Sequence, residues 1–366
     1  MKIKTTREQI LNPLQDVSGV VERRQTLPVL GNILIVTAKD HIELTATDLE
    51  IEITSRCEAQ ILEEGKTTIP ARKLFDICKA LSPGSNISLT IKGSKVLLTS
   101  GRSRFTLAIL PADDFPLVDK VAADTHLSLT QIELKQLIER TSFSMAQQDV
   151  RYYLNGLLFE FTDDLLRAVA TDGHRLATSL LPVPLKIPGK QQVIMPKKGI
   201  QEILRILNNS DELIKMDIGS NHLRLSTELF SFSSKLIDGR FPDYERVIPK
   251  GGDKVIHADR EALKQVLIRT SILSNEKYRG VRLSLDKGLL TVQSHNPEQE
   301  QAEEQLEVNY DGQSLEIGFN VTYWLDILAH IKTEQVEIIL SDENSSCLLQ
   351  EPDNDQNTYV VMPMRL

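Results

Sequence analysis

The sequence predicts an α+β protein made of three tandem copies of one domain, each with two helices packed on antiparallel sheets. Three observations predict it. Three short landmarks recur in the same order along the chain, each copy opens with a capped amphipathic helix, and short alternating strands fill the remainder. Of the three, the landmarks are the strongest evidence, because self-similarity at a fixed spacing indicates a repeated structural unit.

The landmarks keep nearly constant spacing through the chain. Asp48, Asp172 and Asn296 occupy equivalent places, and each lies 124 residues from the next. The aligned segments are 46–49, 170–173 and 294–297; then 69–77, 195–203 and 319–327; and finally Phe115-Pro116, Phe241-Pro242 and Met362-Pro363. The alignment places the domains at residues 1–122, 123–250 and 251–366, with linkers at 118–124 and 249–253.

Local patterns define the elements of each copy. Thr5 and Thr130 each precede a glutamate by three residues, which predicts a capping box, and Asp259 is a good N-cap in the third copy. Apolar residues then recur at helical spacing, although Pro13 interrupts the first of these helices. Second helices are expected over 73–81, 199–207 and 321–331. Alternating runs at 42–46, 87–91 and 223–226 predict strands, joined by tight turns at 92–94 and 286–288.

Composition is that of an ordinary globular protein. The chain has 366 residues, 41% of them hydrophobic, and no apolar run approaches the roughly 18 residues of a membrane span. Its first residues lack the pattern of a signal peptide. The three cysteines, Cys57, Cys78 and Cys347, form no C-x-x-C pair. We therefore expect a cytoplasmic protein in which the thiols are packing residues and no membrane is involved.

Charge is unevenly distributed along the chain. Residues 251–366 hold 10 basic and 20 acidic residues, whereas the first two copies are nearly neutral. A basic end and an acidic end on one chain favour head-to-tail self-association, with apolar side chains providing most of the contact. The residues expected there are Lys73, Arg102, Arg104, Phe105 and Leu107 at one end, and Ile272, Leu273, Glu298, Glu300, Glu303 and Glu304 at the other. The glutamates alternatively form a divalent metal site or a solvated charged face.

Catalytic machinery is not evident. The sequence contains no P-loop, dinucleotide fingerprint, H-E-x-x-H or G-x-S-x-G pattern, and its histidines are scattered. The most enzyme-like stretch, 171–175, aligns with a first copy that lacks its His and Arg, so Asp172 is expected to cap a turn. We predict no enzyme, no catalytic residue, no metal and no cofactor. A catalytic centre at Asp172 and His174 remains as an alternative.

Basic residues recur on or beside equivalent predicted helices. They are Arg72, Lys73, Lys79, Lys135, Arg140, Lys197, Lys198, Arg205, Lys264 and Arg269. Such side chains are often only solubilising, but their recurrence favours helices that face a phosphate backbone without reading bases. No segment is typical of a base-reading module.

Several segments together resemble the bacterial DNA polymerase III beta subunit family, the β sliding clamps. They are 26–32, 100–105, 148–156, 170–176, 238–244 and the apolar tail 359–366, in collinear order from Met1 to Leu366. The resemblance implies a non-catalytic, head-to-tail homodimer that closes into a six-domain ring around duplex DNA, without sequence specificity. It implies as partners the polymerase III alpha subunit, the clamp loader, and other polymerases and repair proteins that carry short linear motifs.

The resemblance also implies two sets of site residues. A peptide groove between the second and third domains would be formed by Arg151, Tyr153, Leu154, Thr171, Gly173, His174, Arg175, Leu176, Pro242, Arg246, Val247, Asn320, Tyr323, Ser346, Val360, Met362, Pro363, Met364 and Arg365. DNA contacts would be made by Arg24, Arg72, Gln148, Tyr152, Lys198, Lys277 and Arg279. Two departures stand out: Asn344 replaces a commonly apolar residue of the groove, and residues 20–23 lack the Gly/Pro-rich form of the loop before Arg24.

The tail has two expected roles. An apolar terminal segment is either a buried strand or an exposed adhesive surface, because free ends are otherwise polar and frayed. The repeat alignment predicts a last core strand, and the resemblance adds one wall of the groove. A peptide-binding scaffold that oligomerises without DNA is the other class of function that these patterns allow.

Overall fold

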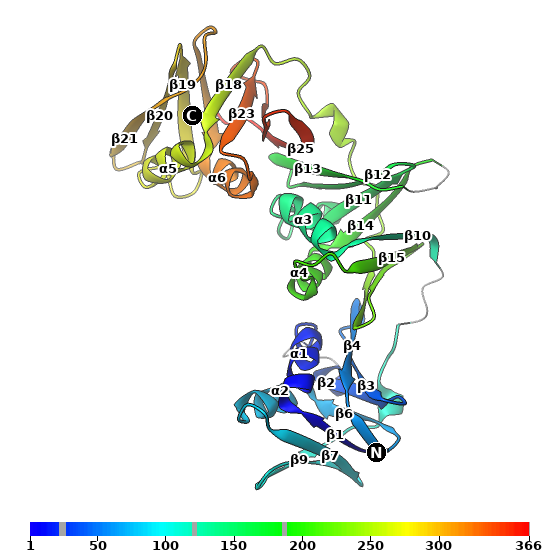
Figure 1. Ribbon diagram of the computed structural model, residues 1–366. Helices are drawn as coiled ribbons and strands as arrows, with labels where there is room; N and C mark the ends of the chain where they lie inside the picture. Colours follow the sequence, from blue (N-terminus) through cyan, green and yellow to red (C-terminus); the bar gives the residue numbers. More distant parts are fainter. Residues whose placement is uncertain (22–26, 119–122, 185–188, 366) are drawn as a thin grey trace. The chain divides into compact units, whose positions relative to one another are not determined.

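The computed structural model describes residues 1–21, 27–118, 123–184 and 189–365. Within these ranges the three repeats each contain two α-helices, as predicted (Figure 1). The helices are α1 (Arg7–Ser18), α2 (Ala71–Ala80), α3 (Gln131–Ser142), α4 (Lys197–Ile206), α5 (Arg260–Ser271) and α6 (Val321–His330). None of them is both long enough and apolar enough to cross a membrane.

Strands and short 3-10 turns make up most of the remaining described residues. The first repeat has β1 (Lys2–Thr6), β2 (Asn32–Thr37), β3 (His41–Thr47), β4 (Ile51–Glu58), β5 (Gln60–Glu63), β6 (Lys66–Pro70), β7 (Asn86–Lys92), β8 (Lys95–Ser100) and β9 (Ser103–Ala108). The second has β10 (Ala123–Thr130), β11 (Gly156–Thr162), β12 (Leu165–Thr171), β13 (Arg175–Pro182), β14 (Gln191–Pro196), β15 (Leu213–Gly219), β16 (His222–Ser226) and β17 (Phe230–Lys235). The third has β18 (Lys254–Asp259), β19 (Gly280–Asp286), β20 (Leu289–His295), β21 (Gln301–Glu307), β22 (Leu315–Asn320), β23 (Gln335–Leu340), β24 (Cys347–Glu351) and β25 (Asn354–Val361).

The chain forms two compact units, and the middle repeat is divided between them. One unit comprises residues 1–132 and 198–236, and the other comprises 133–197 and 237–366. The first holds sheets ordered β5-β1-β7-β8-β9 and β10-β15-β16-β17-β4-β3-β2-β6; the second holds β14-β11-β12-β13-β25-β24-β23-β18 and β21-β20-β19-β22. Each eight-stranded sheet thus joins strands of successive repeats. The domain boundaries at 122 and 250 stay a prediction. The compact units are defined by sheets that two repeats share, so they do not mark where one repeat ends and the next begins.

The first helices of the first and third repeats begin at a polar cap, with one correction. The capping box expected at Thr130 of the middle repeat stays a prediction. The capping box of α1 is formed by Thr6 and Gln9, not by Thr5 and Glu8 as predicted. Thr5 instead lies on the inward face of β1, where its hydroxyl donates to the carbonyl of Glu58 at 2.9 Å. The N-cap of α5 is confirmed, since Asp259 accepts from the Ala262 amide at 2.7 Å.

The second helix of each repeat begins directly after its landmark. Pro70, Pro196 and Asn320 each end a strand, and the helix follows at the next residue. The first two helices therefore start two residues earlier than periodicity predicts. The missed residues are Ala71 and Arg72 in α2 and Lys197 and Lys198 in α4, which add little or no apolar periodicity to reveal the start of the helix.

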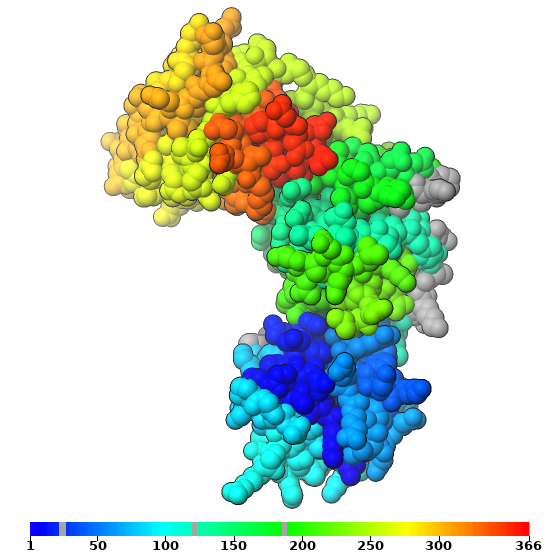
Figure 2. All heavy atoms as spheres, viewed as in Figure 1, coloured from blue at the N-terminus to red at the C-terminus, as the bar shows by residue number. Residues whose placement is uncertain are grey.

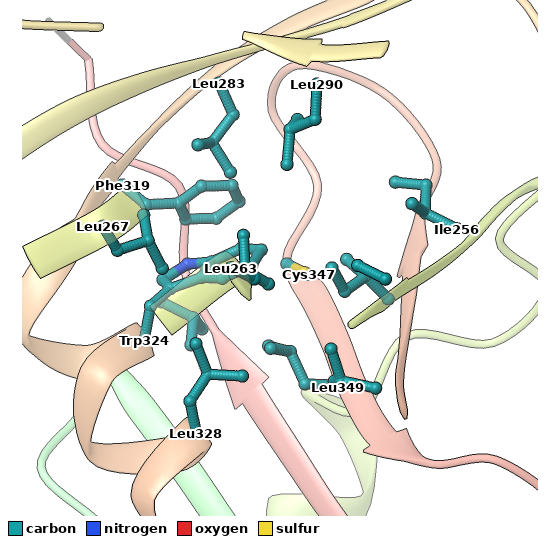
Figure 3. Packing of buried hydrophobic residues seen from close by; sticks show 14 of the residues in the cluster. Ile256, Leu263, Leu267, Leu283, Leu290, Phe319, Trp324, Leu328, Cys347 and Leu349 are labelled. Carbon is teal, nitrogen blue, oxygen red and sulfur yellow. The ribbon is translucent and has the colours of Figure 1, made fainter. Parts of the chain in front are cut away.

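The core of the third repeat holds the C-terminal strand in place. Trp324 of α6 and Phe319 of β22 have ring centroids 5.2 Å apart, and both are buried (Figure 3). Tyr359 and Val361 of β25 belong to the same cluster. Burial of a large apolar side chain contributes about 1.5–3 kcal/mol. The tail is therefore an anchored core strand as far as Val361, which confirms the first expected role.

Candidate functional site

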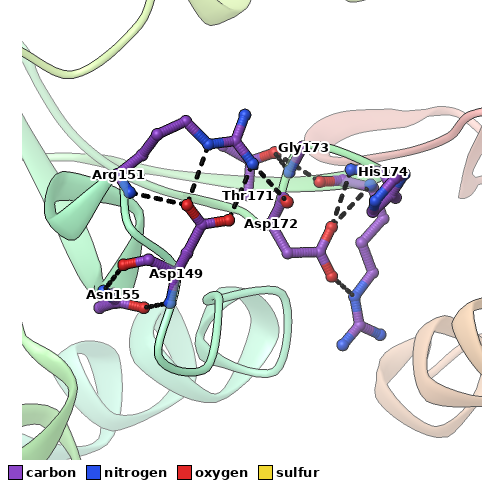
Figure 4. A network of polar contacts seen from close by, with 8 residues as sticks. Asp149, Arg151, Asn155, Thr171, Asp172, Gly173 and His174 are labelled. Atoms are coloured by element: carbon purple, nitrogen blue, oxygen red, sulfur yellow. Dashed lines mark hydrogen bonds and ion pairs between the residues drawn. The ribbon is translucent and has the colours of Figure 1, made fainter.

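The site is organised around a turn that recurs in the repeats. The carboxylate of Asp172 accepts from the amides of His174 and Arg175 at 2.9 and 3.0 Å (Figure 4). In the first repeat, Asp48 caps its own turn in the same way, at 2.9 and 2.7 Å. The predicted turn-capping role of Asp172 is confirmed. Its other oxygen pairs with the guanidinium of Arg175 at 3.0 Å.

A second network fixes the loop that approaches this turn. Asp149 accepts from the backbone amide and the Nε of Arg151, at 2.7 and 3.0 Å, and exchanges hydrogen bonds with Asn155 (Figure 4). These bonds from Arg151 lower the pKa of Asp149 to about 2. Gly173 has φ +89°, and a Cβ there would lie 3.0 Å from the Arg151 guanidinium. The turn therefore requires glycine for its conformation and for this close approach.

Arg175 connects the turn to the third repeat. Its guanidinium pairs with Asp326 of α6 at 2.5 Å and donates to the carbonyl of Phe143 at 2.7 Å. The same group lies 4.7 Å from the ring centroid of Tyr323. Charge-assisted bonds to two carboxylates and contact with an aromatic face fix a largely buried arginine in one orientation.

The tail continues past β25 as an extended segment. The amide of Met362 donates to the His174 carbonyl at 2.9 Å, and that of Met364 donates to Gly318 at 2.8 Å. β25 itself pairs with β13 of the middle repeat. Figure 2 shows the red C-terminal residues on the surface beside green residues of that repeat. Met362 is 39% exposed, so the anchored strand ends in an accessible apolar side chain.

A cavity of about 220 Å³ opens where these elements meet. Eleven of the residues expected in the groove line it: Arg151, Tyr153, Leu154, Thr171, Gly173, Arg175, Leu176, Pro242, Val247, Val360 and Met362. Leu154, Leu176 and Val360 are buried apolar side chains, whereas Arg151 is exposed. An apolar cavity with a few placed polar groups is the usual form of a ligand site.

Other predicted groove residues lie in neighbouring cavities. Arg246, Ser346 and Asn344 line a polar cavity of about 760 Å³, which shares Val247 and Met362 with the first. Pro363, Met364 and Arg365 line a third, of about 770 Å³, which also includes Asn344. His174, Asn320 and Tyr323 line none of these three. The His174 ring nevertheless stacks near Tyr323, with centroids 6.5 Å apart, and Asn320 caps α6.

Two lining residues were not predicted, Asp243 and Tyr244. Tyr244 is 4% exposed and begins a short 3-10 turn, Tyr244–Arg246. A tyrosine outside any helix or strand has no periodic pattern that would predict its contacts. Tyr244 bonds to Arg167 of β12 and Glu160 of β11, which lie 77 and 84 residues earlier. Its neighbour Pro242 belongs to a repeated landmark, and that landmark was the available clue.

Among the described residues, those expected to contact DNA lie on α-helices or in the segments that follow them. Arg72 of α2 is exposed, whereas Lys198 of α4 pairs with Asp48 at 2.5 Å. Gln148 and Tyr152 follow α3, and Lys277 and Arg279 follow α5; Gln148 and Arg279 both have positive φ, near 55° and 52°. Arg24 lies outside the described residues. The structure thus brings these side chains to recurrent places in the repeats.

Several residues of the predicted head-to-tail contact lie on two strands at the edges of their sheets. β9, with Arg104, Phe105 and Leu107, ends the five-stranded sheet, and β21, with Glu303 and Glu304, ends the four-stranded sheet. Ile272, just after α5, is 71% exposed, and Leu273 is half-buried. Lys73 and Arg102 are exposed, as are Glu298 and Glu300. Unpaired edges are natural places for a second chain to add.

The acidic cluster makes protein contacts. Glu304 forms a bidentate pair with Arg269, at 2.6 and 2.5 Å, and Glu303 accepts from Gln293 at 2.6 Å. Among the described residues, no three His, Cys, Asp or Glu side chains are arranged to hold a metal ion.

Three repeats, sheets shared between them and an apolar cavity beside a polar one define a repeat protein with a surface site suited to a ligand. Family sequence models for the DNA polymerase III beta subunit match residues 1–119 (N-terminal domain), 128–243 (central domain) and 245–365 (C-terminal domain). The chain belongs to the DNA polymerase III beta subunit family. Members of this family are non-catalytic processivity factors.

Full-length relatives agree with this assignment. The chain is 54% identical to a beta sliding clamp of Pseudomonas putida and 50% identical to that of Escherichia coli K12, covering all of each. It is also similar to the crystal structure of a sliding clamp (DNA polymerase III subunit beta) from Pseudomonas aeruginosa bound to griselimycin. That comparison gives a TM-score of 0.98 and 54% identity, with both chains fully covered.

Proposed function

We propose that this chain is a DNA sliding clamp, which forms a head-to-tail homodimeric ring of six repeats around duplex DNA and tethers the replicative polymerase. The observation that carries the proposal is the match of three successive family models to three successive repeats over nearly the whole chain. A ring holds DNA topologically, so retention needs little affinity for phosphate. This explains how a chain of net charge −9 can serve as a DNA-binding protein.

Weak, non-specific contact with the duplex is assigned to Arg72, Gln148, Tyr152, Lys198, Lys277 and Arg279. Lys and Arg at helix ends and loops neutralise phosphates without reading bases. The pairing of Lys198 with Asp48 limits the charge that this lysine offers to DNA. Such moderation suits a ring that slides, because strong phosphate binding would slow movement along the duplex.

The apolar cavity is proposed as the site for short linear motifs of the polymerase alpha subunit, the clamp loader and repair proteins. Its floor of Leu154, Leu176 and Val360 suits apolar side chains, and the adjoining polar cavity around Arg246 and Ser346 suits flanking polar residues. A single cavity would hold one motif at a time, so partners would compete. Asn344 makes the junction between the second and third cavities polar and would favour a motif with a hydrogen-bonding group there.

A cytoplasmic location is part of the proposal. The three cysteines are free and buried, and burial raises the pKa of Cys57 to about 11 and of Cys78 to about 12. Thiols with such pKa values remain protonated and unreactive at neutral pH. They behave as small apolar packing residues, which suits a reducing compartment.

Calorimetry with griselimycin tests the groove. We expect the protein to bind this ligand and Met362→Ala to weaken binding roughly tenfold, the factor that corresponds to about 1.4 kcal/mol. Met362 lines both the apolar and the polar cavity, so its removal opens their shared wall. Leu213→Ala, at an exposed residue of β15 that lines neither cavity, is the control. Equal affinity of the Met362 variant and the unaltered protein would place the ligand elsewhere.

A further inference from the structure

We propose that Glu160 is a positioning residue for the peptide groove, acting through Tyr244 to fix the wall formed by residues 242–247. The inference rests on the proposed function of the groove and identifies what holds its shape. Glu160 lies on β11, is 4% exposed and does not line the cavity. A buried carboxylate beside a proposed ligand site needs an explanation, because burying a charge is unfavourable unless partners compensate.

Both oxygens of Glu160 are fully engaged. Oε1 accepts from the Tyr244 hydroxyl at 3.0 Å and lies 3.4 Å from Arg167 Nη1. Oε2 accepts from Lys190 Nζ and from Gln192 Nε2, both at 2.7 Å. The carboxylate thus gathers donors from β12, from β14 and its preceding residue, and from the 3-10 turn at Tyr244. A fully satisfied polar network of this kind favours one arrangement over alternatives.

Tyr244 connects Glu160 to the cavity, because it bonds to the carboxylate and is also a lining residue. Its hydroxyl accepts from Arg167 Nη1 at 2.7 Å while donating to Glu160. The charged groups of Arg167 and Lys190 lie 5.8 and 6.0 Å from the centroid of its ring. Tyr244 also lines the apolar cavity, together with the adjacent Pro242, Asp243 and Val247, and belongs to one buried cluster with Leu154, Leu176 and Val360. The phenol is therefore held at its polar end while its apolar part packs among the residues of the cavity wall.

The protonation states agree with these donor and acceptor roles. Burial raises the pKa of Glu160, but hydrogen bonds from Lys190, Gln192 and Tyr244 outweigh it and lower the pKa below its ordinary value. Burial raises the pKa of the Tyr244 phenol. A charged carboxylate facing a neutral phenol fixes the phenol as donor to Glu160, so the bond has one direction at neutral pH.

The geometry explains why the wall needs such support. Residues 242–247 contain one 3-10 turn and otherwise no helix or strand. Arg167 and Lys190 also approach the carboxylate of Glu245, at 3.5 and 3.9 Å, which adds a second attachment to the same segment. A groove wall without sheet pairing keeps its place through side-chain bonds, and a misplaced wall costs affinity even when the lining residues are unchanged.

The test compares griselimycin binding by calorimetry for Glu160→Gln, Tyr244→Phe and the double variant. Glutamine retains the size of glutamate but turns an NH₂ toward donors, and phenylalanine keeps the lining ring while removing the hydroxyl. We expect each single variant to bind roughly tenfold more weakly. The double variant should be no weaker than the weaker single one, because groups acting through one contact are not additive.

Glu351→Gln is the matched control. Glu351 is another buried glutamate of the same compact unit, with bonds from the Lys332 amide at 3.1 Å and from Asn354 at 2.8 Å, and it lines none of the three cavities. We expect it to lower the thermal unfolding midpoint while leaving griselimycin affinity unchanged. If Glu160 contributed only to stability, Glu160→Gln would likewise lower the unfolding midpoint and leave griselimycin affinity unchanged. A loss of affinity in Glu160→Gln therefore distinguishes a positioning role from a general effect on stability.

The outcomes are distinct. Affinities of Tyr244→Phe and Glu160→Gln within twofold of the unaltered protein would overturn the inference and leave the groove assignment intact. Failure of the unaltered protein to bind griselimycin would overturn the groove assignment, and the inference with it. Should Glu160→Gln fail to fold, Tyr244→Phe decides alone, because its change is confined to one hydroxyl.

Discussion

Three side chains at equivalent positions of the repeats cap local turns with related chemistry. Asp48 and Asp172 each accept from two backbone amides, and Asn296 accepts from the Glu300 amide at 2.9 Å. Only the middle copy adds His174 and Arg175, which face the third repeat and the tail. A turn that is structural in the first copy therefore lines the proposed peptide groove in the middle copy.

At the residue scale, the pair of Asp149 and Arg151 predicts an unusual titration. A carboxyl pKa of about 2 in the folded protein lies below the ordinary value of about 3.9. The stability contributed by this pair is therefore fully present above pH 4 and is lost as pH falls through about 2. Carboxyl-carbon NMR should give a midpoint near 2 for Asp149, and Arg151→Ala should raise it. Arg246→Ala serves as control, and a midpoint near 4 in the unaltered protein would exclude the pair.

The sequence predicted most of the residues that line the cavity, but not the buried residues that hold the lining in place. Arg151, Gly173 and Val360 were placed by resemblance, and the structure brings them together. Glu160 and Asp326 carried no signal, because an isolated acidic residue in a strand or helix looks like any solvated charge. Their importance comes from partners that are distant in the sequence, which periodicity does not reveal.

At the element scale, the capping box of α1 is directly testable. Thr6→Ala removes the side-chain acceptor for the Gln9 amide and the hydroxyl that donates to the Gln9 side chain. We expect a loss of about 1 kcal/mol in the free energy of unfolding, measured by urea denaturation at fixed protein concentration. Lys4→Ala, an exposed residue of β1, is the control. An unchanged free energy for Thr6→Ala would mean that the cap does not stabilise the native helix.

Element boundaries were harder to predict than element types. The strands at 42–46, 87–91 and 223–226 lie within β3, β7 and β16, and Gly93 and Gly288 have the positive φ expected of tight turns. The cap of α1 was misplaced by one residue because Thr5 and Thr6 each precede a Glu or Gln by three. Burial of Thr5 on the inward face of β1 decides between them, and that depends on tertiary packing.

At the scale of the whole molecule, repeats and sheets divide the chain differently. The landmark spacing predicted three copies, and the secondary structure agrees. The continuous eight-stranded sheets were not predicted. Pairings such as β17 with β4 and β13 with β25 link strands more than 170 residues apart, and local sequence patterns do not specify such partners.

The predicted self-association depends on apolar residues near the acidic end. Ile272→Ala combined with Leu273→Ala removes apolar area from an exposed site, and we expect this variant to be monomeric. Light scattering should give about 82 kDa for the unaltered dimer, twice the 41.2 kDa of the chain, and about 41 kDa for the variant. Leu213→Ala, at an exposed residue outside the predicted contact, should remain dimeric. A double variant that stays dimeric would refute this placement of the interface.

Retention on closed and cut DNA tests the ring most directly. The protein is loaded onto nicked circular duplex DNA by a clamp loader with ATP, isolated by gel filtration, and followed after a restriction enzyme linearises the circle. We predict that the protein stays with intact circles at raised salt and dissociates once the DNA is cut, because topology and not phosphate affinity holds it. Equal retention on circular and linear DNA, or loss from both at raised salt, would contradict encirclement and leave only a peptide-binding scaffold.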